Sequence, residues 1–86
     1  YALYIAGASC YQMQDYPEAI EYFEHALDLD PNFVNALFAM GMSHKKKGDF
    51  AAAEKAFERV INLDSDNKMA LFELKLIRKE GGKPEA

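Results

Sequence analysis

The sequence predicts an all-α fold: an α-solenoid of antiparallel helix pairs with five helices. The first observation is a repeat, because sliding residues 1–33 by 34 positions gives ten identities, at Ala2, Leu3, Gly7, Ser9, Asp15, Ala19, Phe23, Glu24, Leu29 and Asp30. The second is a partial third copy, in which "ALFELKLIRKEGG" from Ala70 matches "ALFAMGMSHKKKG" from Ala36. Periods of this length are typical of solenoids, whose units bury their apolar faces only by stacking. We therefore expect one domain over residues 1–80, with repeats at 1–33 and 34–67 and a capping helix at 68–80.

The first unit divides into two helices. One is predicted from about Ala2 to Gln14, with apolar or small residues at helical spacing: Leu3, Ala6, Gly7 and Cys10. The other is predicted from about Pro17 to Leu29, with the same spacing at Ala19, Ile20, Phe23, Ala26 and Leu27. Asp15 suits the N-cap and Pro17 suits the first turn, where a missing N–H costs little. Asp30 and Pro31 should end the helix, because the residue before a proline is driven away from helical angles.

The second unit and the cap follow the same plan. Helices are predicted from about Phe33 to Lys47, from about Ala51 to Leu63 and from about Lys68 to Glu80. Gly48 should end the first of these in a left-handed conformation, which Gln14 must supply in unit one. The final "GGKPEA", residues 81–86, is expected to be a flexible, frayed tail.

Small residues alternate with large rings in the predicted pairs. We expect Gly7 with Ala19, and Gly41 with Ala53, to let the two helices of a unit approach closely. The rings of Phe23 and Phe57 are then expected to fill the space between one unit and the next.

At these positions the chain resembles the tetratricopeptide repeat. The resemblance rests on "LYIAG" and "LFAMG", on "DY" and "DF" at the turns, on "EAIEYFEHAL" and "AAEKAFERVI", and on "LDP". It implies a right-handed superhelix whose first helices line a concave groove for a peptide or helix of a partner. Some members grip a partner's terminal carboxylate with polar residues. We expect no such clamp here, because other residues stand at the places of those polar residues. They are Tyr4, Ala8, Ala39, Met69 and Glu73.

A second stripe on the predicted first helices recurs unit by unit and is our candidate groove floor. It comprises Tyr4, Ala8 and Tyr11, then Phe38, Met42 and Lys45, then Phe72, Leu76 and Lys79, with Asn35 and Met69 beside it. Aromatic and methionine side chains suit the apolar side of a helix or an extended apolar segment. The alternative is that Tyr4, Phe38 and Phe72 merely complete the core.

Composition and charge narrow the classes of partner. The net charge of −4 disfavours nucleic acid, which draws its affinity from basic side chains. An acidic row on one side of a predicted helix is most simply a solvated face: Asp15, Glu18, Glu21, Glu24 and Asp28. No apolar run approaches the roughly 18 residues that a membrane span needs, so no membrane insertion is expected.

The compartment and the extent of the protein give two weaker expectations. The single cysteine, Cys10, excludes an internal disulfide and favours a reducing compartment such as the cytoplasm. The chain begins at Tyr1 inside a helical pattern without an initiator methionine, so we expect a fragment of a longer protein.

Catalytic and metal chemistry find no support in the residue pattern. His25 and His44 lie in different units with no Ser or Cys nucleophile arranged to serve both, and Cys10 falls on the packing stripe. "DLDPN" and "DSDNK" lack the glycine and the glutamate that a calcium loop requires. We therefore expect no enzyme activity, no metal and no cofactor.

The sequence favours a non-catalytic scaffold that binds a protein partner. One alternative is a secretion or folding chaperone that holds an apolar segment of a client. Another is a structural module that self-associates through the exposed end of the solenoid, at Leu3, Ile5 and Ala6.

Overall fold

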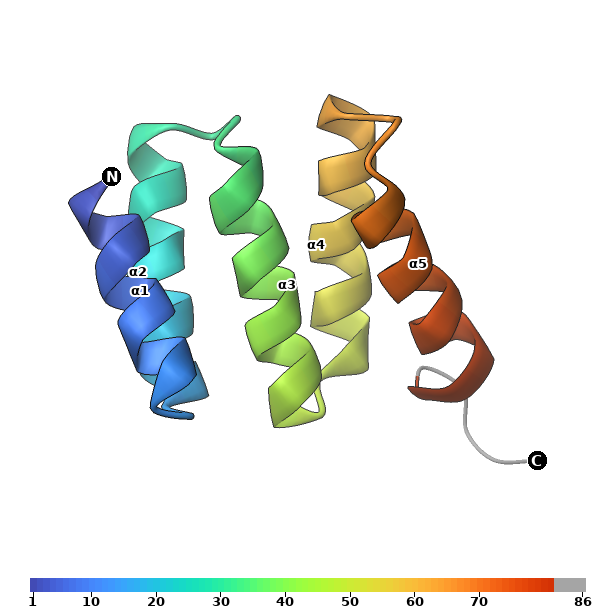
Figure 1. Cartoon of the computed structure of the whole chain (residues 1–86), viewed down its shortest axis with the longest axis horizontal. Coiled ribbons are helices and arrows are strands. Elements are labelled where there is room, and N and C mark those ends of the chain that lie inside the picture. Colours follow the sequence, from blue (N-terminus) through green and yellow to red (C-terminus); the bar gives the residue numbers. More distant parts are fainter. Residues whose placement is uncertain (82–86) are drawn as a thin grey trace.

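The computed structural model describes residues 1–81 and confirms the all-helical class (Figure 1). The described residues form five α-helices, a short π-helical turn and no strand. The elements are α1 (Ala2–Gln12), α2 (Tyr16–Leu29), α3 (Val34–Lys47), α4 (Phe50–Leu63), α5 (Lys68–Leu76) and η1 (Ile77–Gly81).

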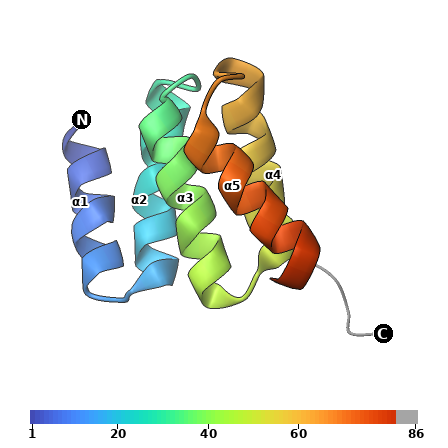
Figure 2. The same ribbon diagram turned by 45° about the vertical axis from the view of Figure 1, so that its right-hand side comes forward.

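Consecutive helices pack as pairs, as expected for two repeat units and a further helix. Helix α1 packs on α2, α2 on α3, α3 on α4, and α4 on α5. Figures 1 and 2 show the helices following one another along the long axis of the molecule, which measures 42 × 27 × 17 Å. Helix α1 also contacts α3, so the first helices of successive units are neighbours on one side.

The helix ends follow the local signals in the sequence. The carboxylates of Asp15 and Asp49 accept hydrogen bonds from the backbone N–H groups of Glu18 and Ala52, at 3.4 and 3.3 Å. Gly48 ends α3 with φ at +89°, and Gln14 takes φ of +64° at the equivalent turn of unit one. Helix α1 stops at Gln12, two residues earlier than predicted, because the chain must turn before Asp15 can cap α2.

The large rings of Phe23 and Phe57 lie directly against the glycine that recurs in the repeat, Gly7 and Gly41. A Cβ atom added to Gly7 would lie 2.6 Å from Cε1 of Phe23, and one added to Gly41 would lie 2.8 Å from Cε1 of Phe57. Each ring therefore packs against the glycine of its own unit. Phe23 also lines a pocket between α1 and α3, together with Phe38 of the next unit. The glycines are required because a methyl group would collide with the ring.

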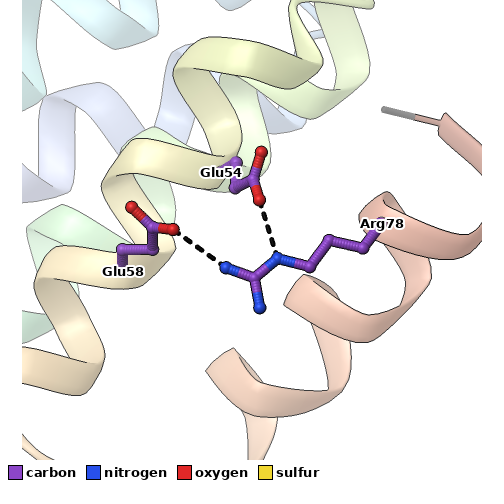
Figure 3. A network of polar contacts seen from close by, with 3 residues as sticks. All are labelled: Glu54, Glu58 and Arg78. Atoms are coloured by element: carbon purple, nitrogen blue, oxygen red, sulfur yellow. Dashed lines mark hydrogen bonds and ion pairs between the residues drawn. The ribbon is translucent and has the colours of Figure 1, made fainter. Parts of the chain in front are cut away.

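The last helix also departs from the prediction. A continuous α-helix from Lys68 to Glu80 was expected, but α5 ends at Leu76 and the chain continues as η1. The guanidinium of Arg78 in η1 reaches back to α4 and forms ion pairs with Glu54 at 2.7 Å and Glu58 at 2.8 Å (Figure 3). Gly81 belongs to η1, and the rest of the predicted tail, residues 82–86, lies outside the described residues.

Candidate partner-binding groove

A concave pocket of about 280 Å³ lies between the first helices of the two units. It brings together five of the predicted groove residues: Tyr4, Ala8, Tyr11, Phe38 and Met42. Gln12, Phe23 and Ala39 complete the lining. The walls are therefore aromatic and aliphatic, with two tyrosine hydroxyl groups and one amide as the side-chain polar groups.

The repeat explains why these side chains meet. Tyr4 and Phe38 occupy the same position in successive units, as do Ala8 and Met42. Because α1 and α3 are neighbours, residues one period apart form a single track across both helices. Three lining residues were not predicted, because they lie off the stripe: Gln12, Phe23 and Ala39. Gln12 is the residue after Tyr11, which belongs to the stripe.

Tyr4 and Phe38 serve both the pocket and the core. The ring of Tyr4 lies 5.9 Å from that of Phe23, and the ring of Phe38 lies 5.3 Å from that of Phe57, measured between centroids. Such tilted aromatic pairs are favourable beyond the area that they bury. Both side chains are half-buried, so one face of each ring packs inward while the rest lines the pocket.

The predicted groove residues of α5 do not line this pocket. Met69 and Phe72 are 65% and 59% exposed, and Leu76 is half-buried. Phe72 differs from its counterparts Tyr4 and Phe38 because the described residues include no second helix in unit three that could bring a ring against it. Asn35, at the start of α3, is exposed and also lies outside the pocket lining.

Lys45 is paired within the molecule. Its ammonium Nζ donates a hydrogen bond of 2.6 Å to Oε1 of Glu73, which joins α3 to α5. The repeat register could have predicted this contact. One period upstream, Tyr11 is equivalent to Lys45 and Ala39 to Glu73, and Tyr11 and Ala39 both line the pocket. The pairing of Lys45 with Glu73 was not predicted from the sequence.

Tyr11 keeps its proton in this setting. Burial raises the pKa of its phenol, and the neighbouring Tyr16 and the charge of Glu73 raise it further. The rings of Tyr11 and Tyr16 meet edge to face with centroids 5.4 Å apart. The hydroxyl group therefore remains neutral near pH 7 and is able to donate a hydrogen bond to a bound segment.

The described residues show no grouping suited to a metal ion, and their single thiol is buried. Over residues 1–81 no three His, Cys, Asp or Glu side chains are grouped so as to hold a metal ion. Cys10 is buried, and the pKa of its thiol is raised by burial and by the charges of Glu18 and Asp15, which suppresses the reactive thiolate. No helix in the same stretch has both the length and the apolar character needed to cross a membrane.

His44 should make the stability of the fold dependent on pH. Its ring is half-buried at the end of α3, and within the described chain Nδ1 has no hydrogen-bond partner. Burial lowers the pKa of this imidazole; Asp49 and Glu24 oppose the shift, while Lys47 adds to it. Because the unfolded chain binds this proton at a higher pH than the folded chain does, stability should fall as pH drops below about 6.5.

Replacing His44 by phenylalanine should remove this component of the pH dependence. The measurement is the free energy of unfolding in urea between pH 7.5 and 5 for both proteins. If the two curves run parallel over this range, the neutral state of His44 does not contribute to stability.

The sequence matches the family model of the tetratricopeptide repeat twice in succession, over residues 1–33 and 34–67. These are the two units recognised from the repeat and seen as the pairs α1–α2 and α3–α4. A search of curated proteins found no match. Tetratricopeptide repeats are in general protein–protein interaction modules without catalytic chemistry of their own. Two consecutive matches that cover most of the chain, together with helix pairs at the matching residues, show that it belongs to the tetratricopeptide repeat family.

Proposed function

We propose that this chain is a non-catalytic scaffold that binds a peptide or helix of a partner protein in its apolar concave groove. The observation that carries the proposal is the pocket between α1 and α3, where two units contribute aromatic and methionine side chains to one surface. Grooves of this kind receive the apolar side of a helix or alternate side chains of an extended segment.

The size of the pocket supports a side chain of a partner as its occupant. With a volume of about 280 Å³, it has room for one or two large apolar side chains. The hydroxyl groups of Tyr4 and Tyr11 and the amide of Gln12 can bond to the backbone of the bound segment.

Two alternatives use features of the same molecule. A secretion or folding chaperone would hold an apolar client segment in the same groove, and Met42 favours it because methionine adapts to varied surfaces. A self-associating module would use the end of the solenoid, where Ile5 is exposed and Leu3 and Ala6 are half-buried. Sedimentation over a range of concentrations distinguishes self-association from the other two.

The same reasoning extends to the class of partner and the compartment. The acidic row on α2 is exposed, which suits a solvated face and disfavours nucleic acid as the partner. A single buried thiol fits a reducing compartment such as the cytoplasm.

The proposal is tested by removing two adjacent walls of the pocket. Phe38→Ala combined with Met42→Ala should weaken binding of a native partner by at least about 2 kcal/mol, the usual effect of losing central apolar anchors. Calorimetric titration measures this, at about 0.1 M and 1 M salt. The affinity should change little with salt, because the pocket lining carries no charged side chain.

The control for this experiment is a charge reversal on the exposed acidic face of α2. Glu21→Lys with Glu24→Lys reverses two exposed charges on α2 and should leave binding unchanged. Because Phe38 also packs on Phe57, the melting temperature of the groove variant must show that it is folded at the temperature of titration. A partner indifferent to the groove pair but lost with the charge reversal would contradict the proposal.

A further inference from the structure

The ion pair between Lys45 and Glu73 is the main charged feature beside the groove. The two side chains are 27% and 13% exposed, so the pair is partly withdrawn from water. Lys45 follows Met42 by three residues on α3, which places it on the same face of that helix as the pocket wall. The charge of Glu73 reaches the pocket as well, since it contributes to the raised pKa of Tyr11.

Stacking of the units does not require this pair. At the preceding junction the equivalent positions hold Tyr11 and Ala39, and α1 and α3 pack there without any charged group. The packing of first helices on one another therefore does not depend on an ion pair at these positions. Lysine recurs at the position of Lys45, as Lys79 one period downstream, whereas the equivalents of Glu73 are Ile5 and Ala39, so the acidic partner is particular to unit three.

The effect of Glu73 is to cancel a cation beside an apolar pocket. Lys45 alone would attract any carboxylate or other anion that lay across the groove, and partial burial would strengthen that attraction. A carboxylate oxygen at 2.6 Å from Nζ removes it at short range. The neighbouring Lys46 and Lys47 do not replace this charge, because both are exposed and side chains one or two residues apart on a helix do not share a face.

We infer that Glu73 determines the specificity of the groove: by neutralising Lys45, it makes the groove select an apolar, uncharged segment from within a partner's chain over one that carries a carboxylate there. The inference rests on the proposed function and names the class of segment that the same pocket takes. It assigns to Glu73 a role in discrimination, because an unpaired lysine would favour acidic segments and chain termini.

A pair of fluorescent probes that differ by one charged group tests the inference. 1-Anilinonaphthalene-8-sulfonate is an apolar aromatic molecule with one sulfonate, and N-phenyl-1-naphthylamine is the same molecule without it. Fluorescence titration with each gives the ratio of the two affinities. Glu73→Gln should raise the affinity for the sulfonate at least about fivefold, as expected for a newly unpaired charge, and change that for the neutral probe less than about twofold.

Further variants connect the effect to Lys45. Glu73→Gln combined with Lys45→Met should return the affinity ratio to that of the unmodified protein. Lys45→Met alone should lower the affinity for the sulfonate at least about threefold, because Glu73 then faces the groove unpaired. This variant also supplies an answer if Glu73→Gln fails to fold, although glutamine keeps the shape of glutamate and an oxygen acceptor for Nζ.

The outcomes separate this inference from the proposed function. If the neutral probe binds and Phe38→Ala with Met42→Ala weakens it, the pocket functions as proposed. An affinity ratio that then stays constant in Glu73→Gln or Lys45→Met overturns the role of Glu73 alone. If the neutral probe does not bind, or binds regardless of the two pocket substitutions, the pocket itself is refuted and the inference falls with it.

Discussion

Phe57→Ala is expected to lower the free energy of unfolding by about 3 to 5 kcal/mol, the usual cost of removing a buried aromatic ring. The side chain is fully buried, and its ring lies against Gly41 on one side and the ring of Phe38 on another. Gly41 has no side chain that could move into the vacated space, so the cavity should persist. Domains of this size have a total stability of about 4 to 12 kcal/mol, so the variant should be close to unfolded at 37 °C.

Urea denaturation at 25 °C measures this loss. Glu21→Ala is the matched control, because Glu21 is exposed on α2, and its effect should stay within about 0.5 kcal/mol. Equal stability of the two variants would mean that Phe57 does not occupy the closed space between α3 and α4.

The positions of the helices could be predicted because the sequence repeats, so that each unit can be compared with the next. Asp15 and Asp49 recur one period apart at two turns, and each accepts a backbone hydrogen bond as an N-cap. Gly48 shows the same consistency, since a left-handed φ is needed where α3 ends. The signals that succeeded act within a few residues along the chain, where sequence spacing and spatial distance correspond.

The errors arose where spacing along a helix does not determine which neighbour a side chain meets. Gly7 and Phe23 were both recognised, but the pattern could not show that the ring packs directly against that glycine. The π-helical turn after Leu76 was missed for a related reason, since Arg78 makes contacts with α4 that no local preference specifies.

The residues predicted for the groove come together in one pocket where two complete units meet, whereas those of α5 do not join them. The periodicity assigned equivalent places to Tyr4, Phe38 and Phe72, yet Phe72 is mostly exposed. Equivalence holds only when each copy has the same surroundings, and α5 lacks the second helix that α1 and α3 each have among the described residues. A terminal unit is therefore where a repeat pattern predicts side-chain burial least well.

Deleting all residues after Ser65 should unfold or aggregate the domain. Three residues of α5 and η1 are almost completely buried: Ala70, Leu74 and Ile77. Both elements pack on α4, so their removal exposes the face of α4 that they cover. Full burial of a leucine or isoleucine contributes about 1.5 to 3 kcal/mol, and the loss of Leu74 and Ile77 together is comparable to the whole stability of a domain of this size.

The position of Lys75 fits the expected role of α5 as a cap. One period upstream stand Gly41 and then Gly7, each so close to a phenyl ring that a single methyl group would collide with it. Lys75 is exposed, and a side chain at this position would collide with a ring placed as Phe57 is placed on Gly41. A terminal repeat needs such a polar outer face to remain soluble.

Thermal unfolding followed by circular dichroism, with light scattering to detect aggregation, compares the truncated and complete chains. Lys75→Ala is the control: it leaves the buried side chains in place and should change the melting temperature by less than about 3 °C, as a surface substitution does. A truncated chain that melts at the temperature of the complete one would show that α4 is stable without its cover. The two units would then not depend on α5, because a buried face that can be exposed without loss contributes nothing to the cooperative unit.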